Sequence, residues 1–105
     1  MVASNDPEVV DVPAESRFVL READAVAELV YELDGERLIL VHTGVPEALG
    51  GQGVGGRLVR ASIARAARDG LTIVPWCPFT RSWLKDHPEA AEGVTVDFKT
   101  PPPAA

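Results

Sequence analysis

The stretch that decides the fold of this chain is Val45-Pro46-Glu47-Ala48-Leu49-Gly50-Gly51-Gln52-Gly53-Val54-Gly55-Gly56-Arg57-Leu58-Val59. It reads as the end of a strand, a loop with five glycines, and a helix that starts without a side-chain cap. Such a helix start leaves backbone N–H groups free at the positive end of the helix dipole, where they bind anions. Glycine suits this loop because it adopts φ > 0 cheaply and has no Cβ to hold a phosphate away. A flexible surface loop is the simpler interpretation, but the run leads directly into an amphipathic helix, which favours an anion site.

The residues around the loop separate the kinds of glycine loop that bind phosphate groups. A P-loop ends in Gly-Lys-Ser/Thr, whereas Gly56 is followed by Arg-Leu. The dinucleotide fingerprint G-x-G-x-x-G is matched at positions 51, 53 and 56. That fingerprint needs a tight turn straight from strand to helix and an acidic residue about twenty positions further on. Residues 46–50 intervene here, and the next strand, residues 72–74, is followed by no acid. The dinucleotide interpretation is therefore disfavoured.

A third kind of loop fits better. Val45, then Gly51-Gln52-Gly53-Val54-Gly55 and a helix, resembles the acetyl-CoA loop of the GNAT N-acetyltransferase superfamily. The usual pattern there is Val-x-Pro-x-x-Arg-Gly-x-Gly-x-Gly/Ala. The chain departs from it twice, because Gly50 stands where Arg or Gln is usual and Pro46 comes one residue early.

The resemblance extends over residues 18–88. Three segments are similar to a small single-domain branch of the superfamily that has a Pro-x-Cys-Pro-Phe segment followed by His-Pro: His42-Thr43-Gly44-Val45-Pro46, Val74-Pro75-Trp76-Cys77-Pro78-Phe79 and His87-Pro88. The resemblance implies acetyl-CoA as cofactor. It also implies these cofactor-binding residues: Thr43, Val45, Gly51, Gln52, Gly53, Val54, Gly55, Gly56 and Arg57.

The implied fold is α/β (α+β), with a mixed central sheet and two parallel strands that splay apart to admit CoA. The local patterns predict the same order of elements. Residues 16–21, 25–33 and 36–43 read as an antiparallel meander, with a hairpin turn at Asp34-Gly35. One main helix follows the glycine loop over residues 57–69 and ends at Gly70.

Further along the chain, residues 71–74 read as a strand parallel to the one before the loop, because a helical crossover joins them. Residues 79–85 read as a short helix, and residues 95–98 allow a further strand. We expect a disordered N-terminal segment at residues 1–14, a single GNAT-like domain at residues 15–98 and a disordered Pro-rich tail at residues 99–105.

The composition and the distribution of charge indicate which classes of partner this chain is expected to bind. Residues 1–36 carry ten acidic and two basic side chains, whereas residues 37–88 carry seven basic and three acidic ones. The positive balance surrounds the glycine loop and favours an anionic cofactor there. An acidic chain with few aromatic residues disfavours nucleic acid as a partner. No apolar run is long enough to span a membrane, and no secretion signal is visible. The single cysteine fits a cytoplasmic protein, and the wide spacing of Cys and His predicts no metal site.

Cys77 and His42 are the candidate catalytic residues. The resemblance implies that the thioester arrives at Cys77. This residue is either the nucleophile of an acetyl-cysteine intermediate, if a neighbour lowers its pKa, or a residue that lines the pocket or protonates the departing thiolate. A cysteine that only packs is the simplest alternative. His42 is a candidate base for the amine, with a structural histidine as the alternative. Many superfamily members use a tyrosine acid after the cysteine strand, but the only tyrosine here, Tyr31, lies on an earlier strand.

These features predict an acetyl-CoA-dependent N-acetyltransferase that moves an acetyl group to an amine, either a protein lysine or a small polyamine. The alternative is a non-catalytic CoA- or acyl-CoA-binding regulatory module, which Gly50 and the missing tyrosine acid favour slightly. Thiol redox sensing through Cys77 is a third interpretation, and it requires an unusually acidic thiol.

Overall fold

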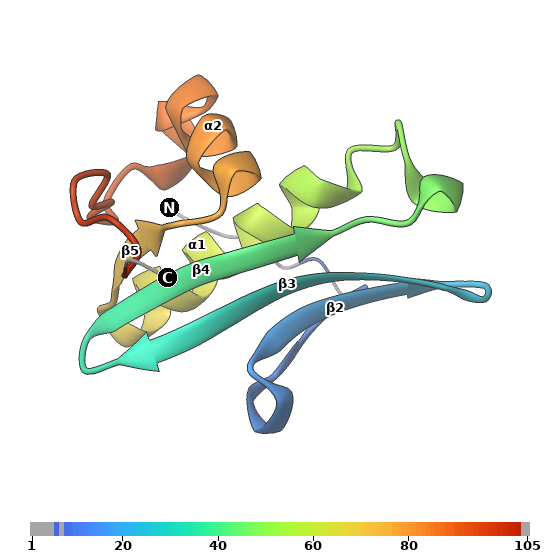
Figure 1. Ribbon diagram of the computed structural model, residues 1–105, viewed down its shortest axis with the longest axis horizontal. Helices are drawn as coiled ribbons and strands as arrows, with labels where there is room; N and C mark the ends of the chain where they lie inside the picture. Colours follow the sequence, from blue (N-terminus) through green and yellow to red (C-terminus); the bar gives the residue numbers. More distant parts are fainter. Residues whose placement is uncertain (1–5, 7, 104–105) are drawn as a thin grey trace.

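The computed structural model describes residue 6 and residues 8–103, and its five strands form one sheet in the order β1-β2-β3-β4-β5 (Figure 1). Strands β1 to β4 pair antiparallel, and β5 pairs with β4 in parallel, so the predicted mixed sheet is confirmed. The strand bounds are β1 Val9–Val12, β2 Arg17–Glu22, β3 Ala25–Asp34, β4 Arg37–Gly44 and β5 Thr72–Pro75.

Two α-helices pack against the sheet. Helix α1 (Val54–Asp69) makes the crossover from β4 to β5, and it begins three residues before the predicted start. Gly70 ends it in the left-handed conformation, at φ +68°, as predicted. Helix α2 (Pro78–Asp86) follows β5. Within residue 6 and residues 8–103, no helix combines the length and the hydropathy that a bilayer crossing needs.

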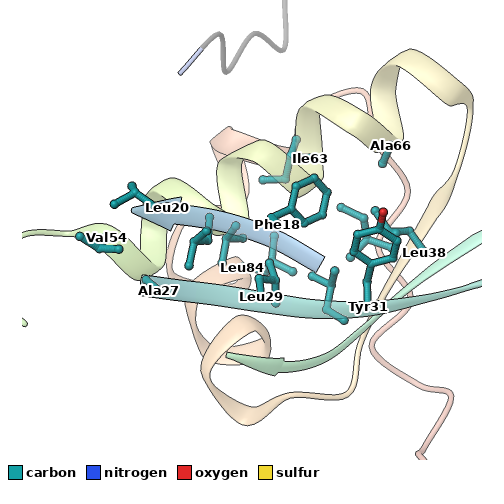
Figure 2. Close-up of a cluster of buried hydrophobic side chains, with 14 of the residues drawn as sticks. Phe18, Leu20, Ala27, Leu29, Tyr31, Leu38, Val54, Ile63, Ala66 and Leu84 are labelled. Carbon is teal, nitrogen blue, oxygen red and sulfur yellow. The ribbon is translucent and has the colours of Figure 1, made fainter. Parts of the chain in front are cut away.

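The core lies between α1 and one face of the sheet. Figure 2 shows that β2 and β3 contribute alternate side chains to it, as the two-residue period of a strand requires. The buried sheet residues include Phe18, Leu20, Ala27, Leu29, Tyr31, Leu38 and Leu40. Helix α1 adds Leu58, Val59, Ile63 and Ala66, which recur at helical spacing, and α2 adds Leu84. This packing anchors α1, so the position of its first turn is set by the core.

A β-bulge in β4 changes which side chains face the helices. Val30 pairs with His42 but Tyr31 pairs with Leu40, so Val41 is one extra residue on β4. Thr43, opposite Leu29, therefore shares the helix-covered face with Leu40, although the two residues are three positions apart and a regular strand would point them to opposite faces. The same shift turns His42 to the other face of the sheet.

Strands β4 and β5 separate beyond their last pair, Leu40 with Pro75. The backbone N–H groups of Trp76 and Cys77 both donate to the carbonyl of Leu40, at 3.0 and 2.9 Å, and the chain then turns into α2. Strand β4 continues to Gly44, paired only with β3. Beyond Leu40 and Pro75 the two parallel strands no longer pair with each other, as the predicted splay requires, and the hydroxyl oxygen of Thr43 lies 3.4 Å from Sγ of Cys77.

The prediction of a disordered segment over residues 1–14 is wrong for residues 9–12. These residues form β1, and residues 13–15 form a short 3-10 helix after it. Val9 packs against the core, and Asp11 accepts a hydrogen bond of 2.6 Å from the hydroxyl of Tyr31. A four-residue strand with no hairpin signal gains its stability from such distant partners, so local pattern does not reveal it. Residues 1–5 and 7 lie outside the described residues.

The predicted disordered tail, residues 99–105, begins too early. The backbone of residues 95–97 hydrogen-bonds to Ile73 of β5, where the sequence allowed a strand. Asp97 then accepts backbone hydrogen bonds from Lys99 and Thr100 at 2.8 and 3.1 Å. The indole N–H of Trp76 donates to the carbonyl of Thr100 at 3.1 Å. The chain is therefore held through residue 100, and residues 101–103 have no regular secondary structure.

Candidate functional site

A cavity of about 420 Å³ opens between the start of α1 and the first turns of α2. Seven of the nine predicted cofactor residues line it, and Gln52 and Arg57 do not. The glycine loop, the end of β4 and the exposed side of α2 thus meet at one place. The lining consists of Thr43, Val45, Leu49, Gly50, Gly51, Gly53, Val54, Gly55, Gly56, Phe79 and Trp83.

The first turn of α1 offers free hydrogen-bond donors to this cavity. Gly53 is the N-cap residue and provides no side chain to satisfy them. The first hydrogen bond into the helix runs from the N–H of Arg57 to the carbonyl of Gly53, at 3.1 Å. The N–H groups of residues 54–56 therefore have no acceptor within the helix, and they lie at its positive end. The sequence predicts an anion site at this helix start; the structure provides the free donors, and anion binding itself stays a prediction.

The glycines of the loop serve two different purposes. Gly51 and Gly53 adopt φ of +76° and +71°, a conformation that strains residues with a Cβ. Gly55 and Gly56 have ordinary helical backbone, but α2 approaches them closely. A Cβ on Gly55 would lie 2.5 Å from Cζ of Phe79, and one on Gly56 would lie 2.7 Å from Nε1 of Trp83. The second pair of glycines therefore allows α2 to close one wall of the cavity.

Arg57 points away from the cavity and is held by the N-terminal segment. It donates to the carboxylate of Asp6 at 2.6 and 2.8 Å and to that of Glu8 at 2.7 Å. These hydrogen bonds, with Asp6 first, raise the pKa of Arg57 above its ordinary value. Gln52 is exposed and also stays outside the lining. Neither side chain is brought to the place where the sequence predicts a bound phosphate.

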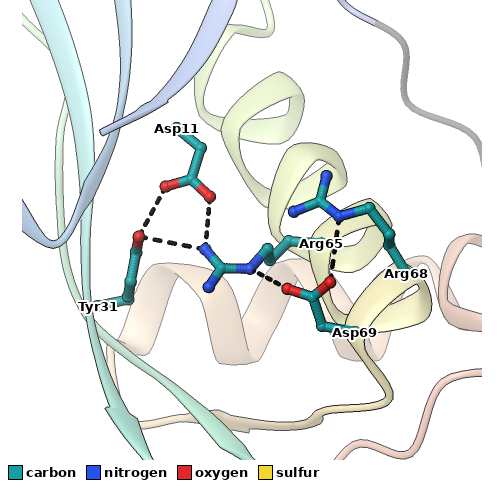
Figure 3. A network of polar contacts seen from close by, with 5 residues as sticks. All are labelled: Asp11, Tyr31, Arg65, Arg68 and Asp69. Carbon is teal, nitrogen blue, oxygen red and sulfur yellow. Dashed lines mark hydrogen bonds and ion pairs between the residues drawn. The ribbon is translucent and has the colours of Figure 1, made fainter. Parts of the chain in front are cut away.

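The positive balance predicted around the loop is partly offset by the acidic N-terminal third, which pairs with two arginines of α1. Besides the pairs of Arg57, Arg65 pairs with Asp11 of β1 and with Asp69 (Figure 3). Arg68 also contacts Asp69, at 3.2 Å. The two oppositely charged parts of the sequence thus meet in space, which weakens the field that would draw an anion to α1.

Cys77 is the N-cap residue of α2; it is buried behind Thr43 and does not itself line the cavity. Its Sγ is 3.4 Å from the hydroxyl oxygen of Thr43, which lines the cavity. Burial acts to raise the pKa of the Cys77 thiol. Hydrogen bonds from the Thr43 hydroxyl and from the backbone N–H groups of Thr80, Phe79 and Thr43 outweigh burial, so this pKa lies below its ordinary value. A thiol in this state forms the nucleophilic thiolate at lower pH.

The structure does not bring the other candidates to Cys77. His42 is exposed on the face of the sheet that α1 and α2 leave open, and it does not line the cavity. Tyr31 is buried, and its hydroxyl contacts Asp11 and Arg65 at 2.6 and 3.3 Å (Figure 3). Burial, followed by the hydrogen bond to Asp11, raises the pKa of Tyr31. Tyr31 therefore lies outside the cavity, and its contacts stabilise the packing of β1, β3 and α1.

Sequence reasoning missed the wall that α2 builds. Phe79 and Trp83 line the cavity, and they lie four residues apart, so they share one face of the helix. That spacing is the signal that the sequence offered. Their orientation toward the glycine loop depends on how α2 packs on α1, which the spacing does not contain.

Comparison with known proteins agrees with this geometry. Residues 17–93 match the family model described as GCN5-related N-acetyl-transferase. The solution structure, determined by NMR, of a GCN5-like protein from Staphylococcus aureus superposes on this chain with a TM-score of 0.67. The two are 27% identical, and the alignment covers 90% of this chain and 95% of that one. Among curated proteins, none matches.

Proposed function

Because the chain belongs to the GCN5-related N-acetyltransferase family, we propose that it binds acetyl-CoA in the cavity beside α1 and transfers the acetyl group to an amine. One observation carries this proposal. The uncapped start of α1 and the Cβ-free glycines line a cavity that leads, through Thr43, to a thiol of lowered pKa. A thioester that carries phosphates needs hydrogen-bond donors for the phosphates at one end of its site and a reactive group near its thioester at the other.

The residues present fit such a cofactor. The free N–H groups of residues 54–56 would hold its phosphates, and Gly51 and Gly53 would let them approach the backbone. Beyond Leu40, strand β4 has an unpaired edge on the side of β5. That edge offers backbone partners to the amide groups of an extended pantetheine arm. Acetyl-CoA supplies an acetyl group in an activated thioester.

We assign the transfer to Cys77. As a thiolate, Cys77 would accept the acetyl group from the bound thioester, with the CoA thiolate as leaving group. It would then pass the acetyl group to the acceptor amine, whose proton goes to solvent, and return to the thiolate. The hydrogen bonds from Thr43 and the start of α2 support this role because they stabilise the thiolate.

Calorimetric titration with acetyl-CoA, CoA and NADH in parallel tests the cofactor. We expect acetyl-CoA and CoA to bind and NADH not to bind, and the absence of binding by all three would overturn the proposal. Intact-mass spectrometry after incubation with acetyl-CoA alone tests the intermediate. Wild type should gain the mass of one acetyl group and Cys77→Ala should not. An unmodified wild type that still acetylates amines would show direct attack instead.

A CoA-binding module without catalysis is the second candidate function. The observation that favours it is the lining of the cavity, in which no acidic, basic or tyrosine side chain occurs among the described residues. A screen of polyamines and lysine peptides separates the two candidates. Transfer by wild type, with loss of transfer but retained CoA binding in Cys77→Ala, supports the enzyme. Tight CoA binding with no turnover on any amine supports the module.

A further inference from the structure

Arg60 differs from the other arginines of α1. Arg57, Arg65 and Arg68 each pair with carboxylates, whereas Arg60 forms no ion pair within the part of the chain that the structure describes. Arg60 is exposed, and its guanidinium carbon lies 5.0 Å from the centroid of the Trp83 ring. Its charge is therefore held in place by a flat aromatic surface and not cancelled by an acid.

Trp83 is itself held in place and borders the cavity. Its ring stacks on His87 with centroids 4.1 Å apart and an angle of 18° between the planes. Nδ1 of His87 lies 2.9 Å from the carbonyl oxygen of Trp83, which orients the imidazole. The indole N–H of Trp83 donates no hydrogen bond within residue 6 and residues 8–103, and it lies at Gly56, in the first turn of α1. An indole donor thus lies in the lining of the cavity, and the guanidinium of Arg60 lies over the same ring, outside the lining.

The position of Arg60 fits a second phosphate group. Arg60 follows Gly56 by four residues, so it lies one helical turn beyond the free N–H groups and on the same side of α1. CoA carries a pyrophosphate and, on its ribose, a separate 3′-phosphate. With the pyrophosphate at the first turn of α1, a cation one turn further along could bind the 3′-phosphate, and a guanidinium does so through paired hydrogen bonds.

We propose that Arg60, supported by Trp83 and His87, binds the 3′-phosphate of CoA and makes the site selective for CoA over its dephospho form. This inference rests on the proposed use of acetyl-CoA. Arg57 is a poorer candidate for the same role, although it is nearer the glycine loop. Asp6 and Glu8 already occupy its donors, and a phosphate would have to displace two carboxylates.

Titration of wild type, Arg60→Gln and Arg68→Gln with acetyl-CoA and with 3′-dephospho-acetyl-CoA tests the proposal. Wild type should prefer acetyl-CoA by about tenfold, the effect of one charge-assisted hydrogen bond. Arg60→Gln should bind both forms with the affinity that wild type shows for the dephospho form. Arg68→Gln removes the same charge from the same helix at an exposed position away from the cavity, so it should keep the preference.

Two results would overturn the inference while acetyl-CoA binding stands. They are equal affinity of wild type for the two forms, and an intact preference in Arg60→Gln. Failure of wild type to bind either form would overturn the proposed function, and the inference with it. The circular dichroism of each variant, compared with wild type, separates a lost contact from a lost fold.

Discussion

At the scale of single residues, Thr43 controls the state of the Cys77 thiol. Its hydroxyl is the largest of the influences that lower the pKa of this thiol against the opposing effect of burial. Thr43→Val keeps the shape of the side chain and removes the donor, so the pKa of Cys77 should rise. The pH dependence of alkylation measures it directly, because Cys77 is the only cysteine. The inflection should move to higher pH in Thr43→Val.

A matched control for this experiment is Thr95→Val, which makes the same change at an exposed position beside β5. It should leave the alkylation profile of wild type unchanged. An inflection at the same pH in wild type and Thr43→Val would show that the hydroxyl does not stabilise the thiolate. The nucleophilic role proposed for Cys77 would then depend on the backbone N–H groups alone.

At the scale of elements, the contact between α1 and α2 depends on two adjacent glycines whose surroundings differ. Phe79, opposite Gly55, is 44% exposed and has room to turn outward. Trp83, opposite Gly56, is held between α1, Arg60 and His87. Overpacking lowers the free energy of unfolding by about 1–3 kcal/mol, whereas replacing Gly by Ala inside a helix raises it by about 1 kcal/mol. Gly56→Ala should therefore lower the free energy of unfolding, and Gly55→Ala should lower it less.

Urea denaturation of the two variants beside wild type measures this order. The variants are a matched pair, since each adds one methyl group to the same turn of α1. Equal stability of the two variants, or a less stable Gly55→Ala, would show that the Trp83 side chain moves aside for the added methyl group as easily as that of Phe79. The proposed rigid support for Arg60 would lose its basis in that case.

The network of Tyr31, Asp11 and Arg65 connects three elements, β3, β1 and α1 (Figure 3). Tyr31→Phe removes the hydroxyl that donates to Asp11 and leaves the rest of the buried ring in place. A lost hydrogen bond to a charged group costs about 1.5–3 kcal/mol, so the free energy of unfolding should fall by this amount. Arg68→Gln, which changes only the exposed edge of the network, should have little effect. Similar stability of Tyr31→Phe and wild type would mean that the hydrogen bond from Tyr31 to Asp11 does not stabilise β1.

At the scale of the whole molecule, carboxylates that join distant segments make the free energy of unfolding depend on pH. The Thr100 hydroxyl first, then backbone N–H groups and Arg37, lower the pKa of Asp97, and Arg57 lowers that of Asp6. A carboxyl with a lower pKa in the folded chain contributes fully above its unfolded pKa, about 3.9. Its contribution is lost as the pH falls through the folded pKa. The free energy of unfolding should therefore decline below about pH 4.

Asp97→Asn should reduce this decline, because it removes the carboxyl that ties the C-terminal segment to Arg37 of β4. Urea midpoints measured at neutral pH and at pH values below that window give the difference. Lys99→Gln is the control, since only the backbone N–H of Lys99 reaches Asp97 and the substitution leaves it in place. An equally steep decline in Asp97→Asn and wild type would contradict the assignment.

Features with a local physical cause were predictable. The turn at Asp34-Gly35, the stop of α1 at Gly70 and the uncapped start of that helix depend on backbone conformations that glycine adopts within a few residues. Features that depend on distant partners were not predictable. Strand β1 has four residues and no turn signal of its own, and it is stabilised by β2 and by Arg65 of α1.

For the site, the sequence by itself determined the glycine loop, the uncapped start of α1 and the parallel arrangement of the two strands that this helix joins. Each of these follows from residue type and from the single helical crossover. Only the tertiary structure decided which side chains enter the cavity. One extra residue in β4 turns Thr43 inward and His42 outward, Asp6 and Glu8 draw Arg57 away, and the packing of α2 presents Trp83. The reason is that the direction of a side chain depends on register and on long-range contacts, neither of which a local pattern contains.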